Sequence, residues 1–484
     1  MILFSFCLFL FFFTLVGFLS VLKKKNTSQD YLLANQEIKP WLAAVSAIAT
    51  SNSGYMFIGQ IGFTYMYGLQ SVWLMFGLIL GDYVSSLFIH KNLRKKSEEL
   101  KVLSYASLVS RWHGKNYRFV QVLGGLIILI FLSTYAAAQL NAGSKSMHVL
   151  FGLDYRLGAI IGGVIVILYC FSGGIRASIW TDVAQSFVMI FAMCLMVIFG
   201  IKELGGISNF THELYNISPD YMKWFPSTGF SDFFFAPFLF ILGWFFSGIG
   251  VIGQPHIMVR FMTINKTNNI PKTRIYYYSW YISFYALTIL AAFIARLLIP
   301  EINNLDPELA LPILASKLLP DFFVGLLLAG IFAATMSTAD SQILSCTASI
   351  TNDLLLNKKN NYLINKIVTL IVTILVVIIA MNDNKNVFNL VLMSWSTLAC
   401  CFSPLLIIYS LKQRTSELLS IMLMVIPLIT LLIWRYFGFN NYIYEVAPGI
   451  ISGILTFFIF KLFGSIHSLN FKKKFKLHIK KNSK

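Results

Sequence analysis

Charged residues are scarce in this chain of 484 residues. Asp, Glu, Lys and Arg together account for 12% of it, whereas soluble domains contain about 25%. Hydrophobic residues account for 57%, and the mean hydropathy is +0.72. This composition excludes an ordinary soluble protein and predicts an all-α integral membrane protein.

Acidic residues are the scarcer ionised type, with 20 Asp and Glu against 38 Lys and Arg, for a net charge of +18. Such a balance can indicate nucleic-acid binding. Here the basic residues gather in short loops between apolar runs and in the C-terminal tail, which is the topological signal of a membrane protein. We therefore expect a lipid bilayer as partner, and no nucleic acid.

Cysteines are few, and the motifs of soluble nucleotide-binding enzymes are missing. The six cysteines all lie in apolar runs without metal-ligand spacing, which predicts buried thiols and no disulfide framework. No Walker motif or Rossmann fingerprint occurs, and the longest hydrophilic stretches reach only about 30 residues. Transport or chemistry must therefore take place within the membrane part.

Thirteen apolar runs are long enough to cross a bilayer, since a span needs about 20 residues. They are 2–22, 40–64, 69–90, 118–144, 157–173, 178–201, 233–255, 276–299, 321–349, 364–381, 387–410, 416–436 and 445–463. The first run lacks the basic start and the cleavage site of a signal peptide and ends at three lysines. We therefore expect it to be a retained helix.

The loop charges predict a multi-pass protein of the plasma membrane with its N-terminus outside and its C-terminus in the cytoplasm. Arg176 and Arg260 are assigned to cytoplasmic loops in this topology. The expected parts are an extra helix and loop (1–39), a five-helix repeat (40–201), an inverted five-helix repeat with its leading loop (202–410), two helices (411–465) and a basic tail (466–484). The tail either favours the anionic leaflet or binds a partner, and no obligatory protein partner is evident.

Two runs contain residues that weaken a helix. The second has the polar centre TSNSG (50–54), and the seventh contains three glycines and Pro255 within eight positions. Hydroxyls bonded back to their own helix would allow the second run to stay continuous. Since unpaired backbone groups in lipid cost several kcal/mol each, we expect broken helices lining a cavity. Broken spans in corresponding places of two halves indicate a secondary transporter.

The ninth run carries a row of hydroxyls. Ala334, Ser337, Thr338 and Ser341 share one helical face, and Asp340 borders it. Hydroxyls commonly join helices, but an ionisable residue inside a span costs at least about 2.5–3.5 kcal/mol and predicts a functional site. Oxygen ligands suit a hard cation such as sodium.

Four further polar residues have weaker interpretations. Asp182 either caps the start of a helix or binds a cation. Asp82 lies in the third run, near an interface, and His256 is expected at the cytoplasmic end of the seventh. Arg176 is expected to snorkel from a short turn.

Three separated segments carry further information: GGIRASIWTDVAQ, GQPHIMVRFM and AATMSTADSQILSCTASITNDL. The first and third resemble two signatures of the sodium/solute symporter family, and the second is similar to its sodium/proline branch. The resemblance spans the second to the eleventh run. It implies a leucine-transporter-like fold with a five-plus-five inverted repeat and about 13 helices.

The resemblance also implies site residues. The expected sodium ligands are Ala49 and Asn52 in the first broken helix with Ala334, Ser337 and Thr338 in the ninth span. A possible second sodium would lie at Asp182 and Ser341, with Asp340 between them.

The implied solute-site residues are Ser51, Ser53, Gly54, Tyr135, Ser247 and Val251. Ser51 stands where the proline branch has an aspartate. Ser247 and Val251 stand where that branch has two aromatic residues, so the pocket should be wider here.

The sequence therefore predicts a sodium-coupled symporter, not an enzyme, that imports a small organic solute by alternating access, with sodium as the co-transported ion. Proline or another amino acid is the nearest solute; a carboxylate, sugar or vitamin is the alternative. A solute sensor, an intramembrane enzyme using Asp182 and Asp340, and a uniporter or proton-coupled carrier are the rival functions.

Overall fold

Helices form the regular structure of this protein. The computed structural model describes residues 1–225, 236–300, 306–355, 361–381 and 387–481. Within these residues, extended segments meet only at an isolated bridge between Ile38 and Ile264. The predicted all-α class is confirmed, and the six cysteines are free thiols.

The helices differ widely in length. The longer ones are α1 (Ile2–Val21), α3 (Pro40–Phe57), α4 (Gly59–Tyr67), α5 (Ser71–Leu100), α7 (Arg118–Phe151), α8 (Tyr155–Glu203), α10 (Ala236–Ile249), α11 (Pro255–Met262), α12 (Ile270–Leu298), α14 (Asp321–Ser349), α15 (Tyr362–Ala380), α16 (Val387–Ser410), α17 (Glu417–Tyr436) and α18 (Val446–Lys481). Short connecting elements are α2 (Ser28–Leu33), α6 (Tyr105–Arg111), α9 (Ile207–Asn216), α13 (Ala310–Leu318) and the 3₁₀ turns η3 (Gly250–Gly253) and η6 (Pro307–Leu309).

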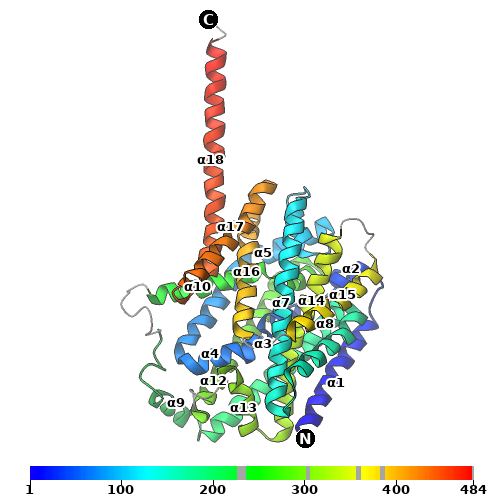
Figure 1. The fold of residues 1–484 in the computed structure, drawn as a ribbon, viewed down its shortest axis with the longest axis vertical. Helices are drawn as coiled ribbons and strands as arrows, with labels where there is room; N and C mark the ends of the chain where they lie inside the picture. Colours follow the sequence, from blue (N-terminus) through cyan, green and yellow to red (C-terminus); the bar gives the residue numbers. More distant parts are fainter. Residues whose placement is uncertain (226–235, 301–305, 356–360, 382–386, 482–484) are drawn as a thin grey trace.

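Ten segments of the described chain are long and apolar enough to cross a membrane, or eleven with the bent pair α10–α11. The predicted thirteen is not reached by this measure. The polar α3 is not among these segments, and α8 joins the predicted runs 157–173 and 178–201. The two termini lie at opposite ends of the bundle (Figure 1).

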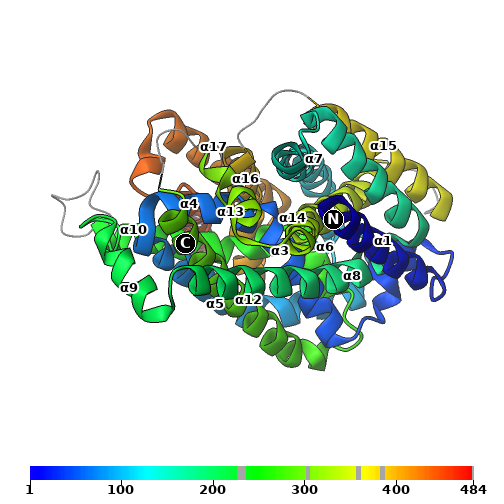
Figure 2. The ribbon, with the colours of Figure 1, turned by 90° about the horizontal axis from the view of Figure 1, so that it is seen from below.

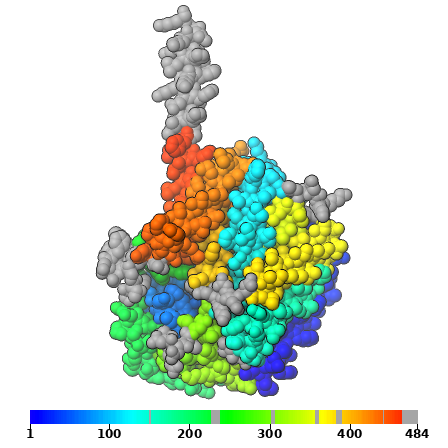
Figure 3. Space-filling model, in the orientation of Figure 1, coloured from blue at the N-terminus to red at the C-terminus, as the bar shows by residue number. Residues whose placement is uncertain are grey.

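The centre of the bundle is α14, in which every residue from Val324 to Ser349 is buried. It packs against α1, α3, α7 and α8, seen around it in Figure 2. Its many Gly, Ala, Ser and Thr residues let these helices approach closely. By contrast, α15 and α17 lie on the outer face in Figure 3, where Ile371, Ile378 and Ile433 are more than half exposed, as lipid contact requires.

Both predicted helix breaks are present. In α3, Ser53 has φ 48° and ψ 179°, which interrupts the helical hydrogen bonds. The N–H of Gly54 donates instead to Oε1 of Gln139 in α7, at 2.8 Å. At the second break, the segments Pro237–Gly253 and Pro255–Met262 meet at 55°.

The predicted turn between the fifth and sixth runs is a kink inside α8. Gly174, at φ 57° and ψ −144°, is its non-helical residue. The prediction that Arg176 snorkels is wrong, because its guanidinium is buried and pairs with Asp30 at 2.6 Å and Glu37 at 3.3 Å. A hydrogen bond from Lys25 lowers the pKa of the Glu37 carboxyl. A buried guanidinium needs such partners to offset its lost hydration.

The packing of α1 on α14 predicts that Gly325→Ala destabilises the protein. The added Cβ would overlap Oγ of Ser5 and the carbonyl oxygen of Ile2. Overpacking of this kind costs about 1–3 kcal/mol. The thermal unfolding temperature of the purified protein should fall. Gly330→Ala on the same helix is the control, since its Cβ would lie 3.7 Å from Ala192; equal behaviour of the two variants would contradict the prediction.

Candidate functional site

The hydroxyl row of α14 faces the break in α3. Thr338 Oγ1 donates to the carbonyl oxygen of Thr50 at 2.9 Å, and Ser337 Oγ lies 3.4 Å from that of Ala49. Both hydroxyls also reach the Ala334 carbonyl, at 3.1 and 3.0 Å. The structure therefore brings together four of the five predicted sodium residues and adds the Thr50 carbonyl, which sequence analysis missed.

The fifth predicted residue, Asn52, is buried at the same break. Neither its side-chain oxygen nor its nitrogen has a hydrogen-bond partner. Buried polar groups are normally paired, so an unpaired amide beside a row of carbonyls and hydroxyls indicates room for a ligand. The donor atoms here are uncharged oxygens, which fit a hard monovalent cation.

A second polar cluster lies beside the first and contains a guanidinium. Arg260 of α11 is fully buried, 3.3 Å from Asp182 Oδ2 and 3.9 Å from Asp340 Oδ1. The hydroxyl of Ser178 donates to Asp340 at 2.9 Å, and Arg260 donates to Ser178 at 2.7 Å. Ser46 of α3 donates to Asp182 at 2.6 Å. The cluster thus joins α3, α8, α11 and α14 through one positive and two negative groups.

Ser341 connects the two clusters. Its hydroxyl accepts a hydrogen bond from Arg260, donates to Asp340 at 2.9 Å and lies 3.2 Å from the hydroxyl of Thr50. Thr50 in turn supplies the carbonyl that Thr338 bonds. The Ser341 hydroxyl would therefore transmit a movement of the guanidinium to the α3 break.

Several predictions need correction at this cluster. Arg260 does not lie in a loop but inside the protein, where an arginine requires partners. Asp182 caps no helix, because it lies eight residues after the non-helical Gly174, inside the second half of α8. The residues predicted for a second sodium, Asp182, Ser341 and Asp340, already surround the guanidinium.

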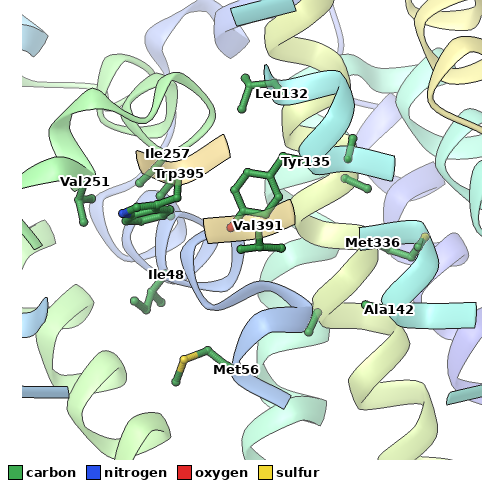
Figure 4. Close-up of a cluster of buried hydrophobic side chains, with 14 of the residues drawn as sticks. Ile48, Met56, Leu132, Tyr135, Ala142, Val251, Ile257, Met336, Val391 and Trp395 are labelled. Carbon is green, nitrogen blue, oxygen red and sulfur yellow. The ribbon is translucent and has the colours of Figure 1, made fainter. Parts of the chain in front are cut away.

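A small cavity of about 40 Å³ lies between α3, α5, α7, α10, α12 and α16. Its lining residues are mostly apolar or aromatic: Ser51, Tyr55, Met56, Leu78, Tyr135, Trp244, Ser247, Tyr281, Tyr285, Val391, Leu392 and Trp395. Three of these lining residues, Tyr135, Val391 and Trp395, are labelled in the cluster of buried side chains in Figure 4. A largely apolar cavity with a few hydroxyls suits a small organic molecule.

The predicted solute residues divide into two groups. Ser51, Tyr135 and Ser247 line the cavity. Ser53 and Gly54 form the α3 break beside it, and Val251, although buried, is not part of the lining. Sequence analysis missed five aromatic lining residues, because aromatic residues are ordinary in membrane helices and no local pattern distinguishes these. They are Tyr55, Trp244, Tyr281, Tyr285 and Trp395.

Two polar residues expected near the ends of helices are internal. His256 is fully buried, with its ring centroid 5.6 Å from that of Tyr135. Asp82 is also fully buried, and neither of its carboxylate oxygens has a hydrogen-bond partner. The sequence analysis placed Asp82 near an interface and His256 at a cytoplasmic end, and it did not foresee that both side chains are buried within the protein.

Comparison with known proteins identifies the family. The family model described as "Sodium:solute symporter family" matches residues 31–426. The chain belongs to the sodium:solute symporter family. This membership confirms the predicted class, a sodium-coupled solute symporter in which sodium is the co-transported ion.

The curated relatives are similar over nearly their whole length. The sodium/proline symporter of Escherichia coli (strain K12) is 28% identical, covering 97% of this chain and 95% of the relative. The sodium/proline symporter of Staphylococcus aureus (strain JH9) is 30% identical, at 92% and 90% coverage. The high-affinity proline transporter PutP of Bacillus subtilis (strain 168) is 27% identical, at 92% and 94% coverage.

Two solved structures share the fold. A sodium-coupled sialic acid symporter in a substrate-bound outward-open state has a TM-score of 0.76 and 19% identity, covering 93% of this chain and 96% of that chain. MhsT in complex with L-phenylalanine has a TM-score of 0.53 and 12% identity, covering 86% and 98%. These matches confirm an all-helical, leucine-transporter-like membrane fold.

The Arg260 cluster predicts a large loss of stability in Arg260→Ala. Removing the guanidinium leaves two buried carboxylates unpaired, and breaking a buried pair costs about 3–5 kcal/mol. Thermal unfolding should show this loss, and adding Asp182→Asn should recover part of it. Arg156→Ala, at an exposed arginine, is the control. A loss no larger than in that control would contradict the assignment.

Proposed function

We propose that this symporter imports a small organic solute, proline or another amino acid, and that one sodium ion binds where the break in α3 meets α14. The observation that carries the proposal is the contact between the hydroxyl of Thr338 and the Thr50 carbonyl at 2.9 Å. Carbonyls freed by a broken helix and hydroxyls from an unbroken one are the donor set of a sodium site. The names of the proline-transporting relatives support the solute class.

The proposed sodium ligands are the oxygens of Ala49, Asn52, Ala334, Ser337 and Thr338. An ion among them would tie α3 to α14 and so stabilise the conformation that accepts solute. Solute in the cavity would then bridge α3 and α10, because Ser51 and Ser247 both line it. Binding linkage requires that sodium tighten solute binding and solute tighten sodium binding by the same factor.

Arg260 leads us to propose a single sodium per cycle. Its guanidinium supplies the positive charge that Asp182 and Asp340 would otherwise require from a second ion. Each sodium that enters a negative interior contributes about 2.3 kcal/mol per 100 mV of membrane potential. One ion with its concentration gradient therefore drives the accumulation of one solute molecule.

The proposed topology has thirteen spans, with the N-terminus outside and the C-terminus in the cytoplasm. It counts α3–α4 and α10–α11 as broken spans and the two halves of α8 as separate ones. Termini at opposite ends of the bundle support an odd number. The repeats are 40–201 and 202–410, preceded by 1–39 and followed by 411–465 and the tail 466–484, part of which lies outside the described residues.

Sodium coupling predicts that uptake into vesicles containing the purified protein requires sodium. With choline in place of sodium, uptake of the solute should fall to the level of protein-free vesicles, at zero and at imposed potential. A proton gradient should not restore it. Equal uptake in choline would contradict the proposal, and uptake driven by protons alone would indicate a proton-coupled carrier.

The ion site predicts that Ser337→Ala and Thr338→Ala each raise the sodium concentration for half-maximal uptake by about 10-fold or more, the effect of losing roughly 1.5 kcal/mol of binding. Ser345→Ala is a matched control on the same helix, since that hydroxyl donates only to the Ser341 carbonyl, at 2.8 Å. Unchanged sodium dependence in both site variants would refute the ligand assignment.

A further inference from the structure

Asp82 is a buried acid whose carboxylate accepts no hydrogen bond in this structure. It lies in α5, is fully buried and has two unpartnered carboxylate oxygens. Asp353 provides the contrast within the same chain, because it is equally buried but its Oδ1 accepts hydrogen bonds from Ser104 at 2.7 Å, Ser107 at 2.6 Å and Gln121 at 3.0 Å. A structural acid is satisfied in this way, so the state of Asp82 indicates an external partner.

Two tyrosine hydroxyls face the same carboxylate. Tyr277 and Tyr278 of α12 place their hydroxyls within hydrogen-bonding reach of the Asp82 carboxylate, although neither hydroxyl forms that bond in this structure. No ion pair to Asp82 forms among the described residues. Arg274, the cation that acts on it, donates to the Ser86 carbonyl at 2.9 Å instead. Four oxygens without a hydrogen-bond partner therefore lie in one buried cluster. Two belong to the carboxylate and two to the tyrosine hydroxyls.

This place adjoins the solute cavity. Leu78, one helical turn before Asp82, lines the cavity, and so does Tyr281, one turn after Tyr277. The rings of Tyr277 and Tyr281 lie 5.8 Å apart, and Ser51 of the lining interacts with both of their hydroxyls. Asp82 thus lies beside residues that line the cavity without lining it itself.

The charge and shape of the cavity favour a cationic group. Six of its twelve lining residues are aromatic, namely Tyr55, Tyr135, Trp244, Tyr281, Tyr285 and Trp395, and none is ionised. Aromatic faces attract ammonium groups, and a carboxylate behind them supplies the opposite charge.

We propose that Asp82, with the hydroxyls of Tyr277 and Tyr278, binds the positively charged amino group of the transported solute. Amines, amino acids included, are then the solute class, and carboxylates and sugars without an amino group are rejected. This inference rests on the proposed function and adds the residue that selects the solute. Because the empty site leaves the carboxylate unpaired, Asp82 costs the protein stability when no solute is bound.

The test uses the full chain, purified, with thermal unfolding in sodium as the measurement. The probes are two pairs that differ mainly in the amino group: L-proline with cyclopentanecarboxylate, and L-alanine with propionate. In the wild type, at least one amine-bearing probe should raise the unfolding temperature, and neither deaminated partner should. Stabilisation by a deaminated probe equal to that by its amine partner, or by no amine-bearing probe at all, would overturn the proposal.

Asp82→Asn should have two opposite effects. Without solute, its unfolding temperature should rise, and the amine concentration for half-maximal stabilisation should increase about 10- to 100-fold. Asp82→Ser should weaken amine binding likewise. Glu98→Gln, which removes an exposed carboxylate from the same helix, should leave amine binding unchanged. Unaltered amine binding in Asp82→Asn would overturn the proposal.

A measurement with sodium and without solute distinguishes a failure of this inference from a failure of the proposed function. Stabilisation by sodium without solute should be the same in the wild type and in Asp82→Asn. Loss of that stabilisation in Asp82→Asn would place Asp82 in a sodium site and overturn the inference. Sodium-independent uptake by the wild type would instead refute the proposed function, whatever the probes show.

Discussion

The site depends on one constraint: backbone groups released by a broken helix inside the membrane must find partners within the protein. The break at Ser53 of α3 meets this constraint through neighbouring helices, because Gln139 accepts the Gly54 N–H and Thr338 donates to the Thr50 carbonyl. The unbroken α14 is therefore both the helix that holds the break and one wall of the proposed ion site. Each such contact compensates a group that would cost several kcal/mol if left unpaired in lipid.

The second organising feature is the buried guanidinium of Arg260. It connects α11, which follows the other helix break, with Asp182 of α8 and Asp340 of α14. Ser341 links this cluster to the α3 break. The two broken segments are therefore joined by charge and by hydroxyls through α14, an arrangement through which ion binding at one break can influence the other. Asp340, which borders the hydroxyl row of α14, supplies half of the negative charge around Arg260.

Much of this could be predicted from the sequence. Runs of apolar residues define spans because each helix must bury its own backbone, and glycine, proline and polar residues within a run mark breaks. The row of Ala334, Ser337 and Thr338 follows from helical periodicity alone. The prediction failed where the position of a residue along an apolar run was used to judge whether its side chain is buried. Tertiary contacts bury four side chains that were assigned to turns or ends: Arg176, Arg260, His256 and Asp82. Hydropathy cannot distinguish a charge at a membrane surface from one paired inside.

The sequence by itself therefore determined the class of fold, the places of both breaks and one face of the proposed ion site, since these depend on local periodicity and backbone chemistry. Only the tertiary structure decided which groups meet. It placed Arg260 between two aspartates from different helices, left Asp82 without a partner beside an aromatic cavity, and assembled that cavity from six helices. Such contacts join residues far apart in the chain, and no local pattern encodes the distance between them.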